Sequence, residues 1–467
     1  MDSSQPSPRG GHQLLWDPNS QHLFLLGGWD GKRDLADFWS FNPLSRSWTL
    51  LSMNVEKEGG PSARSCHKAA LHISTGNIYV LGRYIDPERR DSSSVPCDFY
   101  RYSLGVGEWT RLSADVRAEG GPGCIYDHQM VVDEEEECIW VFGGRLLCGT
   151  NESSVYSGMY KFDLKTLLWT LINSDTCDAL NGCCLPPVSI PSRIGHSMLF
   201  DAQNRNLLIL GGQRYKDQLS DFYKFSIDRD CVTQLWKNLQ MVGGPDSGFT
   251  QRASIDHITR EMFVFSSLVR GSNSNVVTAV VGVTPPELQD QNAINQSAND
   301  DQSCTFWCFD LDQDKWTRIT TSPTSPKPPA RFAHQIVYDS ASQTHFLFGG
   351  NPGTPSDPSA RLDDLWAAKM TKSQGPADIL RHCQYLIRKA MFETMIGDSG
   401  DIPSALKFLQ TDLAAVVNHA DSVESASFRS LSAKLFLKSG SDEGSPSIFD
   451  EIIKFLPKNM QPPATNL

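Results

Sequence analysis

The chain has 467 residues, 39% of them hydrophobic, and a formal net charge of −12. A chain of this length can bury a large core and form one large domain beside a smaller one, whereas the negative charge excludes non-specific nucleic-acid binding, which requires a basic surface. No apolar run is long enough to span a bilayer, the start has no signal-peptide core, and twelve cysteines without a secretion signal favour free thiols in a reducing compartment. We therefore expect a soluble protein of the cytoplasm, with the nucleus as a second location.

The first eight residues, MDSSQPSP, are polar and proline-rich, which predicts a disordered N-terminus over residues 1–8. From residue 9 a pattern repeats six times, and each copy has a pair of large apolar residues downstream of a hydrophobic run. The pairs are Phe38-Trp39, Phe99-Tyr100, Met159-Tyr160, Phe222-Tyr223, Phe306-Trp307 and Leu365-Trp366. In four copies a tryptophan follows nine residues after the pair: Trp48, Trp109, Trp169 and Trp316.

A histidine marks the start of five copies. His12, His67, His128, His196 and His334 each stand 15 residues before the first residue of Gly27-Gly28, Gly82-Arg83, Gly143-Gly144, Gly211-Gly212 and Gly349-Gly350. An arginine precedes four of these histidines by three residues: Arg9, Arg64, Arg193 and Arg331. In the fifth copy the same spacing falls on Gln251 and Ser266, so that copy keeps the register without the repeated residues.

Each copy contains four short apolar stretches bounded by Gly, Pro, Asn and Asp, which indicates four strands. A four-stranded unit with a period of about 50 residues is typical of a kelch-type propeller blade. We therefore predict an all-β six-bladed propeller over residues 9–374, with blades starting near residues 9, 64, 125, 193, 248 and 331 and a disordered insertion over 270–302. Because the glycines, histidines and aromatic residues recur once per blade, we interpret them as packing residues rather than catalytic groups.

Several longer strings resemble one family in particular. They are GGWDG with LADFW (27–31 and 35–39), GPSARSCHK (60–68), DFYRY (98–102), SRIGH (192–196), GFTQRA (248–253), RFAHQ (331–335), RLDDLW (361–366) and LRHCQYLIRK (380–389). Together they are similar to the C-terminal two-thirds of the muskelin family of intracellular kelch adaptors. The resemblance implies a part in cell spreading and in a CTLH/GID-type ubiquitin ligase complex. The family's discoidin-like, LisH and CTLH parts precede its propeller and have no counterpart here, which leaves oligomerisation and ligase assembly without their usual motifs.

The sixth copy has no tryptophan-bearing fourth stretch after Trp366. Propellers often close with a strand from the other end of the chain, and residues 1–8 are too polar and proline-rich to supply one. We therefore expect the closing strand to lie upstream of Met1, and we interpret the chain as a truncated form. An open blade would expose an unpaired edge, which favours aggregation.

From residue 376 the pattern becomes helical, which predicts a small α-helical C-terminal region over residues 376–460. The first helix is expected to have an apolar stripe of Ile379, Leu380, Cys383, Leu386, Ile387, Ala390 and Met391. Further helices are expected from Pro403, over residues 422–438 and over residues 447–456. Two interpretations remain open: a bundle that buries its own stripe, and a surface that binds another protein.

No catalytic motif is present, which predicts a protein that is not an enzyme and has no cofactor. G-x-S-x-G, Walker and H-E-x-x-H patterns are all missing from the sequence. Cys177, Cys183 and Cys184, like Cys304 and Cys308, lack the paired spacing of a zinc site, so we expect no metal. Two glycosylation sequons, at Asn151 and Asn295, are expected to be unused.

Propellers bind through the loops of their faces, and here basic residues follow the glycine pairs. The candidate partner-binding residues are Lys32, Arg33, Arg83, Arg89, Arg145, Arg214, Lys216 and Arg361. Arginine clusters recognise acidic or phosphorylated peptides, although the acidic residues of the same loops also predict simple surface ion pairs. One hypothesis places Arg83 and Arg214 together on a rim that captures a partner.

These observations predict a non-catalytic adaptor, either a substrate receptor or a scaffold subunit of the ligase complex. The expected partners are ligase scaffold subunits and a substrate or receptor peptide, with self-association as a further expectation. The alternative is a cytoskeletal or cell-adhesion scaffold that binds actin or the tails of membrane receptors.

Overall fold

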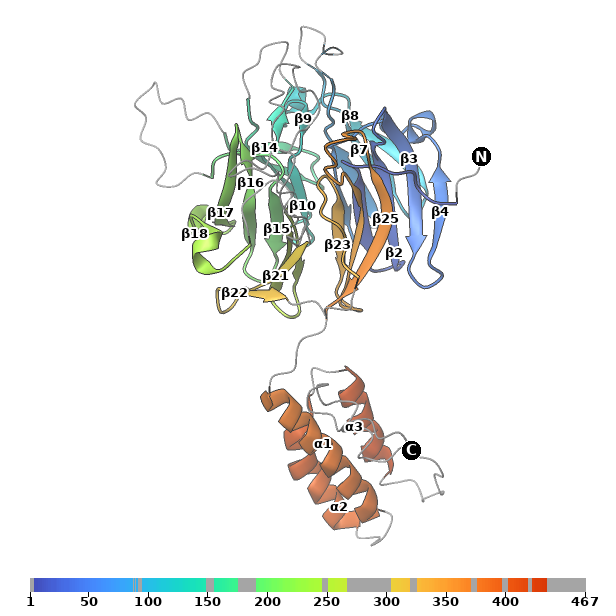
Figure 1. Cartoon of the computed structure of the whole chain (residues 1–467), viewed down its shortest axis with the longest axis vertical. Helices are drawn as coiled ribbons and strands as arrows, with labels where there is room; N and C mark the ends of the chain where they lie inside the picture. The colour runs from blue at the N-terminus through green and yellow to red at the C-terminus, as the bar shows by residue number, and fades with distance from the viewer. Residues whose placement is uncertain are drawn as a thin grey trace. The chain divides into compact units, whose positions relative to one another are not determined.

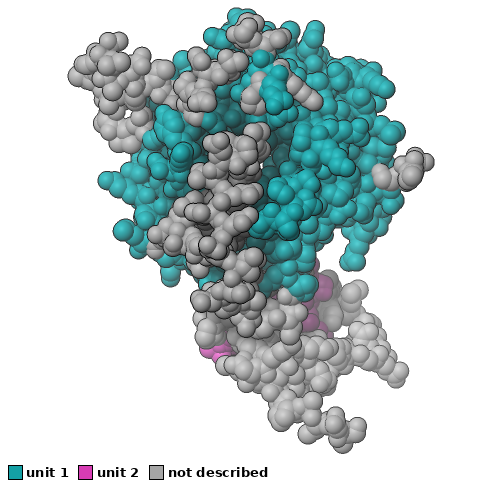
Figure 2. Space-filling view, turned by 45° about the horizontal axis from the view of Figure 1, so that its top comes forward, with its two compact units in different colours: residues 1–370 teal, residues 371–467 magenta. Residues whose placement is uncertain are grey.

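The structure is a computed structural model, and it divides the chain into two compact units, Met1–Met370 and Thr371–Leu467, coloured separately in Figure 2. It describes residues 4–86, 88, 90, 95–147, 155–174, 190–245, 251–266, 304–319, 326–370, 376–396, 402–418 and 422–434. The predicted insertion over 270–302 lies outside these residues, as do Arg89, Asn151 and Asn295.

The first unit is a six-bladed β-propeller, which confirms the predicted fold class. In Figure 1 the orange strands of its last blade stand beside the blue strands of its first blade. Blades 1 and 2 contain β1 (Gln13–Asp17), β2 (His22–Trp29), β3 (Asp34–Asn42), β4 (Ser47–Ser52), β5 (Lys68–His72), β6 (Asn77–Leu81), β7 (Phe99–Ser103) and β8 (Glu108–Ser113). Blades 3 and 4 contain β10 (Gln129–Asp133), β11 (Cys138–Phe142), β13 (Met159–Asp163), β14 (Trp169–Asn173), β15 (Ser197–Asp201), β16 (Asn206–Arg214), β17 (Asp217–Ser226) and β18 (Cys231–Trp236). Blades 5 and 6 contain β19 (Arg252–Asp256), β20 (Glu261–Ser266), β21 (Thr305–Asp310), β22 (Lys315–Ile319), β23 (Gln335–Asp339), β24 (Thr344–Gly350) and β25 (Leu362–Lys369).

Every blade is an antiparallel meander whose first strand is innermost. The first strands β1, β5, β10, β15, β19 and β23 contact one another in this order, and β23 contacts β1, so the ring is closed at its centre. A small two-stranded sheet of β9 (Ile125–Tyr126) and β12 (Arg145–Leu146) lies beside blade 3. Among the described residues the sixth blade has three strands, with β25 at its outer edge.

The blades pack through the tryptophans of their fourth strands. Trp109 of blade 2 lies 6.1 Å from Phe38 of blade 1, and Trp169 of blade 3 lies 5.5 Å from Phe99 of blade 2, measured between ring centroids. Trp109, Trp169 and Trp316 also cover glycines that follow short 3₁₀ helices. These helices are η1 (Val55–Glu58), η3 (Val116–Glu119) and η4 (Leu239–Val242). A Cβ on Gly60 would lie 2.9 Å from the Trp109 ring. These large apolar contacts between neighbouring blades supply much of the core.

The start of the chain contributes to the first blade. Pro6 is buried, and the carbonyl and the hydroxyl of Ser7 accept hydrogen bonds from the Arg9 guanidinium at 2.9 Å and 3.0 Å. The prediction of disorder over residues 1–8 is therefore wrong for residues 4–8, because a buried guanidinium needs acceptors and this segment supplies two of them.

The second unit is helical, as predicted for the C-terminal region. It contains α1 (Pro376–Thr394), α2 (Ile402–Phe408), a π-helical turn over Leu409–Leu413, a 3₁₀ turn over Ala414–Val416 and α3 (Ser422–Lys434). Leu386, Phe392, Leu409, Leu413 and Leu431 form its core. The helix expected over 447–456 lies outside the described residues.

The predicted apolar stripe of α1 is only partly buried. Leu386 is 8% exposed, whereas Leu380, Ile387 and Met391 are 60%, 47% and 51% exposed. The stripe is therefore split: one edge packs on the unit's own core, and the other lies on the surface of the unit.

Candidate functional site

Four buried arginines connect the second and third strands of their own blades. Arg9 Nη1 donates to Asp37 Oδ1 at 2.6 Å and to the carbonyl of Gly27 at 3.0 Å. The same arrangement recurs in three other blades as Arg64 with Asp98, Arg193 with Asp221, and Arg331 with Asp364. Because a buried guanidinium is stable only when it is paired and hydrogen-bonded, these residues serve the fold.

The aspartates of these pairs were not identified from the sequence, although a signal for them exists. Asp37 stands two residues before Trp39, and the equivalent positions of blades 3 and 5 hold Gly158 and Thr305. Those are the two blades that also lack the arginine, since blade 3 has Ile125 in its place. The joint loss of both partners within one chain indicates that they form a pair.

The repeated histidines lie between the glycine pairs of adjacent blades. A Cβ on Gly27 would lie 3.2 Å from Cε1 of His67 in the next blade, and a Cβ on Gly28 would lie 2.8 Å from Cβ of His12 in the same blade. His12, His67, His128, His196 and His334 are all fully buried. Burial lowers the pKa of each imidazole well below its usual value, so the rings are neutral.

The residue after each repeated histidine, or after Gln251 in blade 5, faces the axis of the propeller. Gln13, Lys68, Gln129, Ser197, Arg252 and Gln335 form a ring that lines a channel cavity of about 140 Å³. Gln13 Nε2 donates to the carbonyl of His67 at 2.8 Å, and Arg252 Nε donates to the carbonyl of His334 at 3.2 Å. Polar side chains at the start of otherwise apolar strands are the signal by which sequence reasoning could have found this ring.

A second cavity, of about 170 Å³, lies at the mouth of the channel. Gln13, Lys68, Arg252 and Gln335 line it as well as the channel cavity. Above them are the residues that precede the histidines, whose backbone has positive φ angles of 53–63°: Gly11, Cys66, Asp127, Gly195 and Ala333. Four of these, Gly11, Cys66, Asp127 and Ala333, line the mouth cavity, and Trp29, Tyr84, Phe332, Asp86 and Arg361 complete much of its wall.

A chain of backbone hydrogen bonds runs along this mouth through five of the six blades. Gly195 N donates to Asp127 O at 3.2 Å, and Asp127 N donates to Cys66 O at 3.0 Å. Cys66 N donates to Gly11 O at 2.9 Å, and Gly11 N donates to Ala333 O, also at 2.9 Å. The chain passes through blades 4, 3, 2, 1 and 6; the fifth blade's residue at this position lies outside the described residues. The mouth is therefore held by the backbone, and the side chains of Cys66 and Asp127 are left at the cavity.

Burial perturbs the charged groups of the mouth. It lowers the pKa of the Lys68 ammonium to about 8, and the nearby Arg252 guanidinium acts in the same direction. Burial raises the pKa of the Asp127 carboxyl, against the opposing effect of Lys68, and it raises the pKa of the Cys66 thiol, which also donates to Asp127. Perturbed titratable groups gathered in a cavity are typical of functional sites.

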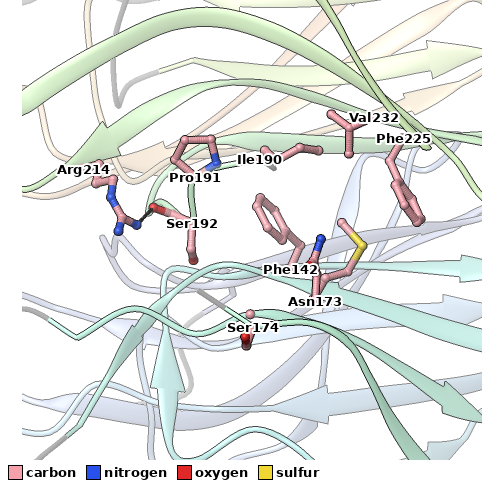
Figure 3. A pocket seen from close by; sticks show the side chains of 11 residues that line it. Phe142, Asn173, Ser174, Ile190, Pro191, Ser192, Arg214, Phe225 and Val232 are labelled. Atoms are coloured by element: carbon pink, nitrogen blue, oxygen red, sulfur yellow. Dashed lines mark hydrogen bonds between the residues drawn. The ribbon is translucent and has the colours of Figure 1, made fainter. Parts of the chain in front are cut away.

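A third cavity, of about 220 Å³, lies between blades 3 and 4 and is shown in Figure 3. Phe142, Phe225 and Val232 form an apolar wall, and Arg214 donates to the Ser192 carbonyl at the opposite end. The Arg214 guanidinium also lies over the rings of Tyr156 and Tyr215, at 4.6 Å and 5.2 Å from their centroids. Arg214 is thus held by contacts with residues of both blade 3 and blade 4.

The structure places the predicted basic residues in several different surroundings. Arg361 lines the channel mouth. Arg33 forms an exposed ion pair with Asp30, and Arg83 donates to the Ser62 hydroxyl at 3.0 Å. Lys32 and Lys216 are exposed. Arg145 lies in β12 beside blade 3. The predicted rim of Arg83 and Arg214 stays a prediction.

In the part of the chain that the structure describes, no group of three or more His, Cys, Asp or Glu side chains is arranged to bind a metal ion. In the same part, no helix is long and apolar enough to cross a membrane. Cys304 immediately precedes β21, and its thiol lies 3.3 Å from the Pro329 carbonyl. Cys177, Cys183 and Cys184 lie outside the described residues.

Comparison with known proteins supports a propeller of the kelch and attractin type. A family model described as Attractin/LZTR1 beta-propeller matches residues 1–183. Mei4-dependent protein 6 of Schizosaccharomyces pombe is 26% identical over 418 residues, which is 87% of this chain and 54% of that protein. Kelch repeat and BTB domain-containing protein 3 of Mus musculus is 32% identical over 117 residues, or 24% of this chain and 18% of that protein. Multiple epidermal growth factor-like domains protein 8 of Homo sapiens is 25% identical over 246 residues, which is 50% of this chain and 8% of that protein.

The chain therefore spans about half the length of the first of these relatives and a small part of the others. What they share with it is the propeller, a fold that typically serves as a protein-interaction module.

Proposed function

We propose that the chain is a non-catalytic protein-interaction adaptor whose propeller binds a partner at the mouth of its central channel. The observation that carries this proposal is the contrast between two sets of polar residues. The repeated arginines and aspartates are paired with each other inside the blades. Lys68, by contrast, is 8% exposed and forms no hydrogen bond or ion pair with any residue the structure describes, and it lines a cavity.

We further propose that the adaptor acts as a substrate receptor or scaffold subunit of a CTLH/GID-type ubiquitin ligase. Support comes from the strings that resemble the muskelin family, which extend into α1 through LRHCQYLIRK. The exposed edge of α1, with Leu380, Ile387 and Met391, offers an apolar helix face of the kind that docks in a partner's groove.

The test is co-purification of the whole chain from cells, followed by mass spectrometry of what comes with it. A double variant, Leu380→Glu with Ile387→Glu, changes the exposed edge of α1 while leaving the unit's core in place. Leu44→Glu, at an 86% exposed position of the propeller, is the matched control. Ligase scaffold subunits that accompany the wild type and the control, but not the double variant, would support the ligase proposal.

Other outcomes separate the alternatives. Actin or adhesion-receptor tails among the co-purified proteins, together with co-sedimentation with actin filaments, would favour the cytoskeletal scaffold instead. If the double variant keeps every partner, the exposed edge of α1 is not the docking surface. The absence of any specific partner from every preparation would contradict the adaptor function itself.

A further inference from the structure

Two cationic side chains face each other across the channel. Lys68 begins β5 of blade 2, and Arg252 begins β19 of blade 5. In the ring of first strands, β5 and β19 are separated by two strands on either side, so these two residues lie on opposite walls. Both line the mouth cavity and the channel cavity. Like charges that converge on one enclosed space repel each other unless an anion lies between them.

Of the two charged members of this ring, Lys68 is the one without a hydrogen bond or ion pair to a described residue. Its neighbour Gln13 donates to two backbone carbonyls, and Arg252 donates to the carbonyls of Gln251 and His334. Lys68 is more than nine-tenths buried as a residue, and its ammonium forms no hydrogen bond or ion pair within the described part of the chain. A buried, unpaired cation is costly, and Gln fills the equivalent position in blades 1, 3 and 6 without that cost.

The charge, size and walls of the mouth indicate what fits there. Three cationic and two anionic side chains line the cavity, namely Lys68, Arg252, Arg361, Asp86 and Asp127. Their net charge is +1, so one monoanion would neutralise the cavity, whereas a phosphate dianion would give it a net negative charge. A volume of about 170 Å³ holds roughly six water-sized groups, which matches a short acidic side chain. Trp29, Tyr84 and Phe332 supply apolar walls for its methylene groups.

We propose that the channel mouth binds the carboxylate of an acidic side chain from a partner peptide, and that Lys68 and Arg252 bind that carboxylate from opposite sides. This inference rests on the proposed adaptor function and specifies the chemistry that the propeller recognises. The aromatic residues select a side chain over a free inorganic anion, because they contact its carbon atoms.

The test uses three pools of fluorescein-labelled nonapeptides. Glu, Gln or phosphoserine is fixed at the central position, and the other positions vary among uncharged residues. Binding to the whole chain is measured by fluorescence anisotropy. The Glu pool should bind at least tenfold more tightly than the Gln pool, since a charge-assisted hydrogen bond is lost in the latter. Lys68→Gln should weaken binding of the Glu pool at least tenfold, whereas Lys57→Gln, at an exposed position of η1, should leave it unchanged.

Lys68→Gln is expected to fold, because Gln13, Gln129 and Gln335 already occupy the equivalent positions, and a thermal melt verifies this. Equal binding of the Glu and Gln pools, preference for the phosphoserine pool, or unchanged binding by Lys68→Gln would each overturn the proposal. No binding of any pool would overturn it as well. Cellular partners that co-purify equally with the wild type and Lys68→Gln would leave the adaptor function standing while excluding this site.

Discussion

The five buried histidines make the propeller sensitive to mild acid. His12, His67, His128, His196 and His334 are fully buried, and neither ring nitrogen of any of them lies within hydrogen-bonding geometry of a described side chain. Burial is the main cause that lowers the pKa of each, with Arg9, Arg64 and Arg193 adding to the effect for His12, His67 and His196. The native state therefore keeps them neutral at pH values where the unfolded chain binds protons.

The sign and the size of the effect follow from linkage. A histidine with a lowered native pKa favours the unfolded state as the pH falls below the ordinary value of about 6.5. At pH 5.5 each such residue lowers the free energy of unfolding by up to about 1 kcal/mol, and by far less at pH 7. The five together should remove up to several kcal/mol between pH 7 and pH 5.5, which is a large part of the stability of about 5–15 kcal/mol of a folded domain.

Burial also shifts the pKa of two further groups, His345 and Asp127. His345, whose pKa burial lowers to about 3, changes stability in the same direction as the five. Asp127, whose pKa burial raises, acts in the opposite direction because its native form binds a proton more readily than its unfolded form. Neither changes the sign of the total.

The assay is urea unfolding followed by tryptophan fluorescence at half-unit steps from pH 7.5 to 5.0. His128→Gln should reduce the pH slope by about one-fifth, because Gln251 already fills the equivalent position in blade 5. The reciprocal variant Gln251→His should increase the slope by a similar amount. A free energy of unfolding that stays constant from pH 7 to 5.5, or equal slopes in both variants and the wild type, would refute the reasoning.

Three further predictions concern stability at single positions. Lys68→Gln should stabilise the propeller at pH 7 by up to about 3 kcal/mol, because it removes an ammonium whose pKa falls from 10.5 to about 8 on burial. Denaturation should show a smaller stabilisation at pH 10.5 than at pH 7, because the wild-type ammonium is then deprotonated. Asp98→Ala should lower the free energy of unfolding by about 3–5 kcal/mol, because it leaves a buried guanidinium unpaired. The double variant Arg64→Ile with Asp98→Ala should lower it by less, because Ile125 takes the arginine's place in blade 3. Calorimetry of both variants would show the difference. Gly82→Ala should lower the melting temperature by several degrees, because φ is +78° and the new Cβ would lie 2.3 Å from the Ile125 carbonyl oxygen; an unchanged melting temperature would mean that the backbone moves aside freely.

The propeller was predictable because most blades repeat the same residues at the same spacing. Gly-Gly, the aromatic pair and the tryptophan recur at fixed spacing, and a strand pattern repeated six times admits few architectures. The partners of the repeated residues were harder to predict. Arg9 is visible in the sequence as part of Arg-x-x-His, but its contact with Asp37 spans 28 residues and depends on how two strands are folded together.

The channel mouth was not predicted, because its residues belong to positions that look structural. Lys68 and Asp127 flank repeated histidines, and only the closed ring brings them to one cavity. The basic residues of the loops were predicted as the binding site instead, because the sequence shows where charges occur but not which residues lie next to them in the fold. Of those eight residues, Arg361 lines the mouth. The division of the α1 stripe into a buried and an exposed edge could not be predicted either, because helical spacing identifies an apolar face but not how much of that face is buried.

The hydrogen bonds around the mouth give the propeller a mechanical property that its separate sheets would lack. The bonds that run from Gly195 through Asp127, Cys66 and Gly11 to Ala333 join five neighbouring blades, so a load on one of these blades is passed to the next through the backbone. An open array of repeats can fray from its ends, since a terminal repeat has one neighbour. A ring closed at its centre has no terminal repeat there. We therefore expect the blades to unfold together, in one transition, rather than peel away one at a time.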